Sequence, residues 1–200
     1  MRVLAWLERG LFAVGAGFAV WCAIVVLQAE YYKHLPVPSP TSRSVSTLPG
    51  EFPHENRIAA RHQTVKAGSW VARLEAPTAA LSATVLEGSD DETLMRAAGR
   101  IEDTAFPGDF GNIGIAGHRD TIFRPVRKLR VGEPLVLTTA NRVFRYRITK
   151  TAVVNPEDVY VLDPADHPTM TLVTCYPFEF IGHAPQRYIV SADLVEEARR

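Results

Sequence analysis

Residues 170–175 read Met-Thr-Leu-Val-Thr-Cys, an apolar, β-branched run that ends in a thiol. Such a run predicts a buried strand that brings Cys175 to its carboxyl end. Arg187 follows further along the chain, and His118 lies well upstream. A lone thiol with a histidine and an arginine elsewhere in the chain is either a cysteine nucleophile or a buried core cysteine. The thiol alone does not separate these two interpretations.

The flanking sequence predicts a domain that is mainly β. Apolar and polar residues alternate as they do in half-buried strands. We expect strands over residues 70–74, 81–86, 113–117, 135–139, 143–154, 171–175 and 188–192. About seven short strands with little helix favour a closed or nearly closed β-barrel. Ser89 and Glu92 have capping-box spacing, so we expect one short helix with Ser89 as its N-cap and a stop at Gly99.

An uncharged apolar stretch, Leu11–Ala29, precedes this domain. As a helix it would be about 28 Å long, close to the hydrocarbon thickness of a bilayer, so it predicts a transmembrane anchor. A cleaved signal peptide is the alternative, but no Ala-x-Ala-like site follows the stretch. The slight excess of positive charge from Arg2 and Arg9 favours a cytoplasmic segment 1–10. We therefore expect a single-pass protein of the inner cell membrane with an extracytoplasmic domain.

The cysteines and the composition divide the rest of the chain. Cys22 lies in the apolar stretch, so Cys175 is expected to stay unpaired in a compartment where thiols often oxidise. Residues 30–69 contain a run rich in Pro, Ser and Thr that predicts a stalk. The catalytic domain is expected to span 70–194, followed by a C-terminal tail over 195–200.

Charge and residue spacing exclude some classes of protein. The chain has 22 basic and 22 acidic residues, a net charge of +0, so nothing suggests a nucleic-acid partner. Cysteine and histidine lack the short spacings of a zinc site, and no metal or other cofactor is expected. Glu87, Asp90 and Asp91 are a weak signal for calcium.

Three segments carry a resemblance to a known family. They are 114–121 (GIAGHRDT), 171–178 (TLVTCYPF) and 187–190 (RYIV). They resemble the signature stretches of the sortases, most closely the class D branch of Gram-negative and related bacteria. The similar region runs from about Trp70 to Ala192 and implies an eight-stranded sortase barrel with short helices. Arg100 departs from the pattern, since relatives often have histidine there, and we expect it to alter only a contact at the rim.

The resemblance implies a membrane-anchored cysteine transpeptidase. Such an enzyme cleaves a surface protein at a sorting signal of the Leu-Pro-x-Thr-Gly type through a thioester. It then joins the new carboxyl end to an amine of a peptidoglycan precursor or of a protein lysine. An L,D-transpeptidase-like thiol enzyme is one alternative, but its Ser-His-Gly-Cys type motif is absent. An inactive barrel scaffold is another, and the intact Cys, His and Arg argue against it. The sorting motif, the substrate and the acceptor are not encoded in recognisable form.

The residue types also fit this chemistry without the family. Cys175 is the candidate nucleophile, and His118 can protonate the leaving amine and then deprotonate the incoming one. Arg187 carries a permanent charge and a planar fork of donors that suits a developing oxyanion. Thr174 is a possible accessory donor, and Asp120 is a possible partner that orients the histidine.

Overall fold

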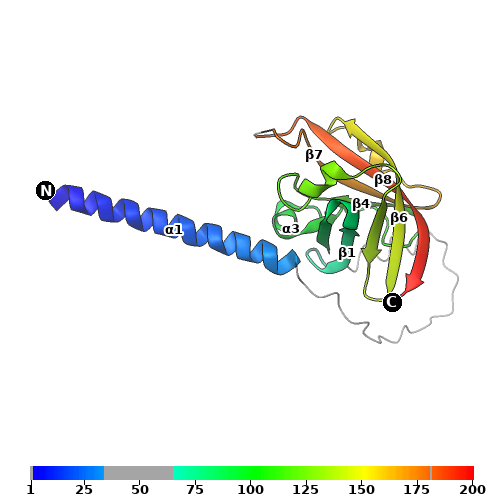
Figure 1. The fold of residues 1–200 in the computed structure, drawn as a ribbon, viewed down its shortest axis with the longest axis horizontal. Helices are drawn as coiled ribbons and strands as arrows, with labels where there is room; N and C mark the ends of the chain where they lie inside the picture. The colour runs from blue at the N-terminus through cyan, green and yellow to red at the C-terminus, as the bar shows by residue number, and fades with distance from the viewer. Residues whose placement is uncertain (1, 34–64, 181) are drawn as a thin grey trace.

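Eight strands close into one barrel, and a long helix precedes it (Figure 1). This computed structural model describes residues 2–33, 65–180 and 182–200. Around the barrel the strands follow the order β1-β2-β3-β4-β7-β8-β6-β5, and β5 pairs back to β1. The pairs β2–β3 and β4–β7 are parallel, whereas the others are antiparallel. The predicted closed eight-stranded barrel is therefore confirmed.

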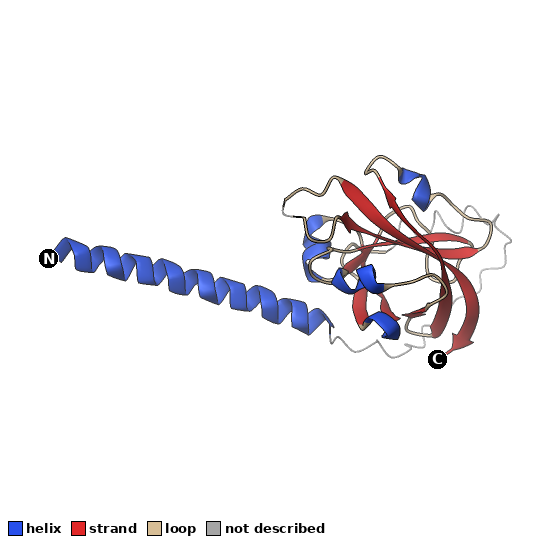
Figure 2. Cartoon of the chain, turned by 45° about the horizontal axis from the view of Figure 1, so that its top comes forward, coloured by secondary structure: helices blue, strands red, loops and turns tan. Residues whose placement is uncertain are grey.

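Every regular element of the described barrel domain is short except two strands. The strands are β1 (Trp70–Ala76), β2 (Leu81–Glu87), β3 (Ala98–Arg100), β4 (Gly111–Ala116), β5 (Pro134–Thr138), β6 (Arg142–Val154), β7 (Pro168–Tyr176) and β8 (Gln186–Arg199). The helices in the connections are α3 (Asp91–Arg96) and the 3₁₀ helices η1 (Pro77–Ala79), η2 (Arg124–Lys128) and η3 (Val159–Leu162). Figure 2 shows these helices around the outside of the barrel.

The barrel interior is filled by the alternate residues of each strand. In β6, for example, Phe144, Tyr146 and Ile148 are buried while the residues between them are exposed. In β7, Met170 and Leu172 face the same interior. Since the side-chain period of a strand is two, this register places Cys175 on the outer face of the barrel. Each fully buried large apolar side chain stabilises the fold by roughly 1.5–3 kcal/mol relative to exposure.

The helix before the barrel, α1 (Arg2–Lys33), is longer than the predicted anchor. Its segment Arg9–Gln28 is the one helical stretch among the described residues that is long and apolar enough to cross a membrane. The predicted stalk begins too early, because residues 30–33 are still helical. Most of that stalk, 34–64, lies outside the described residues.

The connection after β2 differs from the sequence prediction. Asp90, not Ser89, caps α3, and its Oδ1 accepts a hydrogen bond from the Thr93 backbone N–H at 3.1 Å. The helix ends at Arg96, and the predicted stop at Gly99 is wrong because this glycine belongs to β3. A Cβ on Gly99 would lie 2.1 Å from the Gly88 carbonyl oxygen, so a side chain here would prevent this close approach.

Arg100 lies inside the barrel wall, so the expected rim contact is wrong. Its side chain is 1% exposed. Its Nε and Nη2 donate to the two carboxylate oxygens of Glu87, at 2.7 and 2.5 Å. Its Nη1 donates to the carbonyl oxygen of Thr104 at 2.5 Å, and the guanidinium lies 4.0 Å from the centre of the Phe106 ring. This buried charge is fully paired, as a charge inside a protein must be.

The strand β8 continues through most of the region expected to be a tail. Residues 196–199 pair with the start of β6, in register from Arg142 opposite Arg199. An ion pair of 2.6 Å joins Arg142 to Glu197 across the two strands. Residues 195–199 are all exposed and three of them are charged, so the sequence lacked the alternation that marks a strand.

Candidate active site

The candidate nucleophile and the candidate oxyanion donor lie opposite each other on neighbouring strands. Cys175, near the end of β7, pairs with Arg187, near the start of β8, in the antiparallel register. Directly opposed residues of an antiparallel pair have their side chains on the same face, with Cβ atoms about 4.5–5.5 Å apart. Both side chains are partly buried on the outer face of the barrel. The strand register therefore places Cys175 and Arg187 as neighbours on one face of the sheet.

Among the described residues, no acidic side chain neutralises the charge of Arg187. Its Nη1 donates to the backbone carbonyl oxygens of Ala184 at 3.2 Å and Gln186 at 3.0 Å. Within the described part of the chain, no carboxylate forms an ion pair with it. Backbone carbonyls therefore hold this guanidinium, a group that suits a thiolate or an oxyanion as a partner.

His118 is brought to the same site by the backbone of the residue before it. The Gly117 N–H donates to the carbonyl oxygen of Val173 at 3.2 Å, and the Thr174 hydroxyl donates to the Gly117 carbonyl oxygen at 2.7 Å. Both partners belong to β7 and immediately precede Cys175. His118 therefore leaves β4 next to the end of β7. Its ring makes no hydrogen bond or ion pair with another side chain in the described ranges.

A buried aromatic residue holds the loop that carries His118. Phe123 is fully buried, and its N–H donates to the His118 carbonyl oxygen at 3.0 Å. A Cβ on Gly117 would lie 2.7 Å from the Phe123 ring. Glycine is required at 117 because the ring packs against the backbone there. This packing holds the backbone of His118 next to β7, although the imidazole has no side-chain partner among the described residues.

The two expected accessory residues are placed differently from each other. Thr174 is 3% exposed, and its hydroxyl is committed to Gly117, so it acts on the backbone that positions His118. Asp120 is exposed and makes no hydrogen bond to His118. The structure therefore does not join Asp120 to the imidazole that it was expected to orient.

Three aromatic rings pack together where β7 ends and β8 begins, and the sequence analysis did not assign them a role. Tyr176 stacks on Tyr188 at a centroid distance of 6.2 Å, and Phe178 meets the edge of Tyr188 at 5.3 Å. Tyr188 stands opposite Thr174 in the register of β7 and β8. The rings fix the first residues of the loop that connects these strands. In the sequence, the Tyr-Pro-Phe run directly after the thiol is the signal for this cluster.

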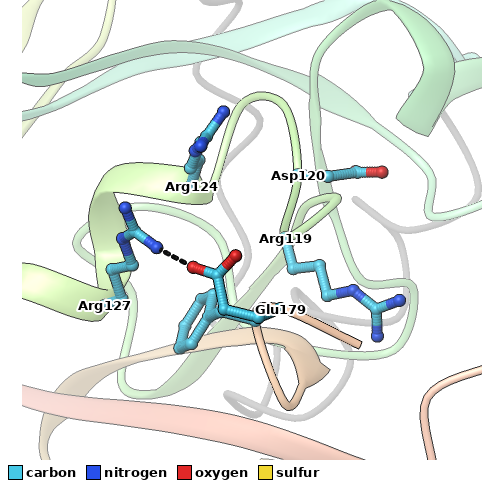
Figure 3. A pocket seen from close by; sticks show the side chains of 6 residues that line it. Arg119, Asp120, Arg124, Arg127 and Glu179 are labelled. Carbon is cyan, nitrogen blue, oxygen red and sulfur yellow. Dashed lines mark hydrogen bonds and ion pairs between the residues drawn. The ribbon is translucent and has the colours of Figure 1, made fainter. Parts of the chain in front are cut away.

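Arg119 connects the two loops that border the site, a contact that the sequence analysis also missed. Its Nη2 donates to the carbonyl oxygens of Phe180 at 2.6 Å and Gly182 at 3.0 Å. It thereby joins the residue after His118 to the loop after Cys175. A cavity of about 160 Å³ lies between these loops (Figure 3). It is lined by Arg119, Asp120, Arg124, Arg127, Phe178 and Glu179.

Two of the three acids considered for calcium have partners within the protein. The carboxylate of Glu87 is committed to Arg100, and both carboxylate oxygens of Asp90 accept hydrogen bonds from Thr93. Those hydrogen bonds lower the pKa of Asp90. Across the described residues, no group of three or more His, Cys, Asp or Glu side chains could hold a metal ion.

Known proteins are similar to this chain in both sequence and fold. The family model for the sortase domain matches residues 74–195. Sortase D of Bacillus subtilis is 36% identical over 118 residues, which are 58% of this chain and 60% of that protein. The match therefore covers less than two thirds of this relative.

Solved structures agree in fold. The chain is similar to a Clostridium perfringens Sortase D5 transpeptidase with a TM-score of 0.61 and 35% identity, covering 71% of this chain and 89% of that one. It is also similar to sortase E1 of Streptomyces coelicolor, solved with a tripeptide in its active site. That match has a TM-score of 0.60 and 32% identity, and covers 66% of this chain and 92% of that one. With a closed barrel of the same fold and a family match over most of the domain, this chain belongs to the sortase family.

Proposed function

We propose that this protein is a membrane-anchored cysteine transpeptidase in which Cys175, His118 and Arg187 carry the reaction. The observation that carries the proposal is the register of β7 and β8, which sets Cys175 opposite Arg187. The hydrogen bonds that join Gly117 to Val173 and Thr174 support a position for His118 at the same edge of the barrel. These three side chains supply a nucleophile, an acid–base group and an oxyanion donor.

In the first half-reaction, the thiolate of Cys175 attacks the carbonyl carbon of the scissile amide. Negative charge develops on the carbonyl oxygen, and the guanidinium of Arg187 stabilises it. His118 donates a proton to the leaving nitrogen, the C–N bond breaks, and a thioester remains on Cys175. An imidazole suits this step because it exchanges protons near neutral pH.

In the second half-reaction, an acceptor amine attacks the thioester carbonyl. The neutral imidazole of His118 takes the proton from the amine, and Arg187 again stabilises the oxyanion. The C–S bond breaks and restores the thiolate, so the enzyme returns to its starting state. The net reaction exchanges one amide for another and needs no oxidant, metal or cofactor to balance.

The substrate class follows from family membership. We infer that the donor is a surface protein with a sorting signal of the Leu-Pro-x-Thr-Gly type and that the acceptor is an amine of a peptidoglycan precursor or of a protein lysine. The tripeptide bound in the active site of the Streptomyces coelicolor relative supports a peptide donor. The same similarity argues against an L,D-transpeptidase and gives no support to an inactive scaffold.

The direct test is the mass of the thioester. The full chain in detergent micelles is mixed with a library of Leu-Pro-x-Thr-Gly-type peptides, and the intact protein is weighed within the first turnover. We expect an added mass equal to the acyl half of the cleaved peptide, located on Cys175. Cys22→Ala is the matched control and should keep the adduct, whereas Cys175→Ala should lose both the adduct and the products. Product formation by Cys175→Ala would exclude the thioester mechanism.

We further propose that the domain lies outside the cytoplasm, with α1 as its anchor. The apolar segment Arg9–Gln28 supports an anchor, and the positive charges of Arg2 and Arg9 at its N-terminal end support this orientation. Alkaline phosphatase fused after Gly50 should be active in cells, and a reporter that works only in the cytoplasm should be inactive at the same position. The reverse pattern would place the domain inside and remove surface proteins as substrates.

A further inference from the structure

The cavity beside the candidate active site has walls that continue directly from the proposed catalytic residues. One wall begins with Arg119 and Asp120, which follow His118, and continues into η2. The other wall contains Phe178 and Glu179, which follow Cys175 by three and four positions. The cavity is thus joined to the acid–base group on one side and to the nucleophile on the other.

The walls carry more positive than negative charge. Arg127 and Glu179 form an ion pair, drawn as the dashed line in Figure 3. Arg124 is exposed and has no ion-pair partner in the described segments. Arg119 contacts only backbone carbonyls with its Nη2. Two arginines therefore remain against one carboxylate, Asp120, although the whole chain has a net charge of +0.

Two features of these arginines favour an anionic ligand. The Nη1 of Arg119 is buried and finds no hydrogen-bond acceptor among the described residues, so this guanidinium is only partly satisfied by its carbonyl contacts. The Arg127–Glu179 pair is solvent-exposed, with 36% and 79% of the side chains accessible. Exposed ion pairs contribute only ~0–1 kcal/mol to stability. A ligand anion can therefore replace Glu179 as the partner of Arg127 at little cost.

The size of the cavity limits what it can hold. At about 160 Å³ it is smaller than the roughly 300–1,000 Å³ of pockets that enclose a whole ligand. It fits one functional group of a larger substrate. The ring of Phe178 supplies an apolar wall for the few methylene groups next to that functional group.

We propose that this cavity binds an anionic group of the acceptor substrate, a carboxylate or a phosphate a few bonds from the attacking amine. The inference rests on the proposed function, in which His118 exchanges its proton with the amine in both half-reactions. A group that binds beside Arg119 and Asp120 therefore belongs to the amine side of the substrate. Arg124 and Arg127 attract its anion, and Asp120 limits the attraction by repulsion.

The test compares acceptors that differ only in the anion. The full chain in micelles first forms the thioester, detected by mass, and then partitions between water and an added amine. Lysine is compared with lysine amide, and O-phosphoethanolamine with ethanolamine. We expect lysine to be used about fivefold better than its amide, a preference that salt weakens because the cavity is partly exposed. The phosphate pair of acceptors shows whether a phosphate serves as well as a carboxylate.

Two charge variants should change the preference for lysine in opposite directions, and a third serves as a control. Arg124→Gln should remove most of the lysine preference, and Asp120→Asn should increase it. Lys128→Gln is the matched control, because Lys128 lies at the end of the same helix η2 but does not line the cavity. It should leave the preference unchanged. Equal use of lysine and lysine amide by a protein that forms the thioester would overturn the proposal, and so would equal losses in Arg124→Gln and Lys128→Gln.

A binding measurement keeps the inference separate from turnover. In full-length Cys175→Ala, the NMR signals of the arginine Nε–H groups are followed while lysine or lysine amide is added. We expect lysine to shift the Arg124 and Arg127 signals at lower concentration than lysine amide. Absence of a thioester in the wild-type chain would count against the proposed function only. Identical titrations by the two amines would count against the anion subsite.

Discussion

Two arginines of this barrel are held in opposite ways. Arg100, the last residue of β3, is buried, and its guanidinium binds Glu87 and Thr104 and packs on the ring of Phe106. Arg187 lies on the outer face, where backbone carbonyls are its only hydrogen-bond partners in the described part of the chain. The first charge is neutralised inside the fold, and the second is left available beside a thiol. The comparison shows that the partner of an arginine, rather than its residue type, separates a structural charge from a candidate catalytic one.

The largest effect is expected on the outer face, from His118. His118→Ala should reduce the rate of transpeptidation about 10²–10⁴-fold, the usual contribution of a general acid–base group. His118→Asn should not restore the rate, because an amide cannot transfer the proton. The free energy of unfolding should be nearly unchanged in both variants, since the ring has no partner in the described part of the structure. A rate within tenfold of wild type would remove His118 from the mechanism.

The next largest effect is expected from the buried pair Arg100–Glu87, as a loss in the free energy of unfolding. Arg100→Met leaves the Glu87 carboxylate buried without its partner, and removing one member of such a pair costs about 3–5 kcal/mol. The double variant Arg100→Met with Glu87→Leu should recover much of that loss. Pulse proteolysis of the full chain in guanidinium measures the free energy of unfolding of the single and the double variant.

The matched control for this prediction is the exposed pair Arg142–Glu197. Arg142→Met should change the free energy of unfolding by less than about 1 kcal/mol. An equal loss in Arg100→Met and Arg142→Met would contradict the distinction between buried and exposed pairs.

A smaller effect is expected from the hydrogen bond that positions His118. Thr174→Val leaves the Gly117 carbonyl oxygen without its donor, which costs about 1–3 kcal/mol where the group is buried. The turnover rate should fall about tenfold with little change in KM, and Thr174→Ser should restore it. Thr171→Val removes a similar buried hydroxyl of β7 that bonds Asn112, so it should reduce stability and leave the rate unchanged. Equal losses of rate in the two valine variants would argue against a positioning role.

The smallest effect concerns an exposed charge pair at the start of β7. The ring of His167 contacts Asp166 at 2.6 Å, and this hydrogen bond raises the pKa of His167 above its ordinary 6.5. A raised folded-state pKa stabilises the fold below pH 6.5, and the contribution is lost as pH rises through the folded-state value. Because the pair is exposed, the stability change should be slight. NMR titration should show the His167 pKa falling in Asp166→Asn, and an unchanged value would assign the shift to another group.

Much of the barrel could be predicted because its strands alternate or form continuous apolar runs. The strand β3 could not, since Ala98–Arg100 is only three residues long and depends on pairing with β2 and β4. Arg100 was placed at the rim because a charged residue is usually exposed. Its burial depends on Glu87, its partner across the parallel strands β2 and β3, and no sequence motif marks that pairing.

The candidate site was predicted in part. The motifs around His118, Cys175 and Arg187 could be read from the sequence, and their assigned roles stay predictions. The connection made by Arg119 could not be read, because its acceptors are backbone carbonyls about sixty positions away and every residue has one. Asp120 lies close to His118 in sequence, but the loop turns its side chain to the cavity instead.

The availability of the Arg187 charge is tested most directly by kinetics of Arg187→Lys beside a measurement of unfolding. Lysine keeps the charge and loses the planar fork, so we expect kcat to fall about 10²–10³-fold, as when an oxyanion donor is removed. KM and the free energy of unfolding should stay close to wild type, because charge on the substrate oxygen develops only in the transition state. A Lys variant within threefold of the wild-type kcat, or one whose rate falls only because the barrel unfolds, would contradict this account.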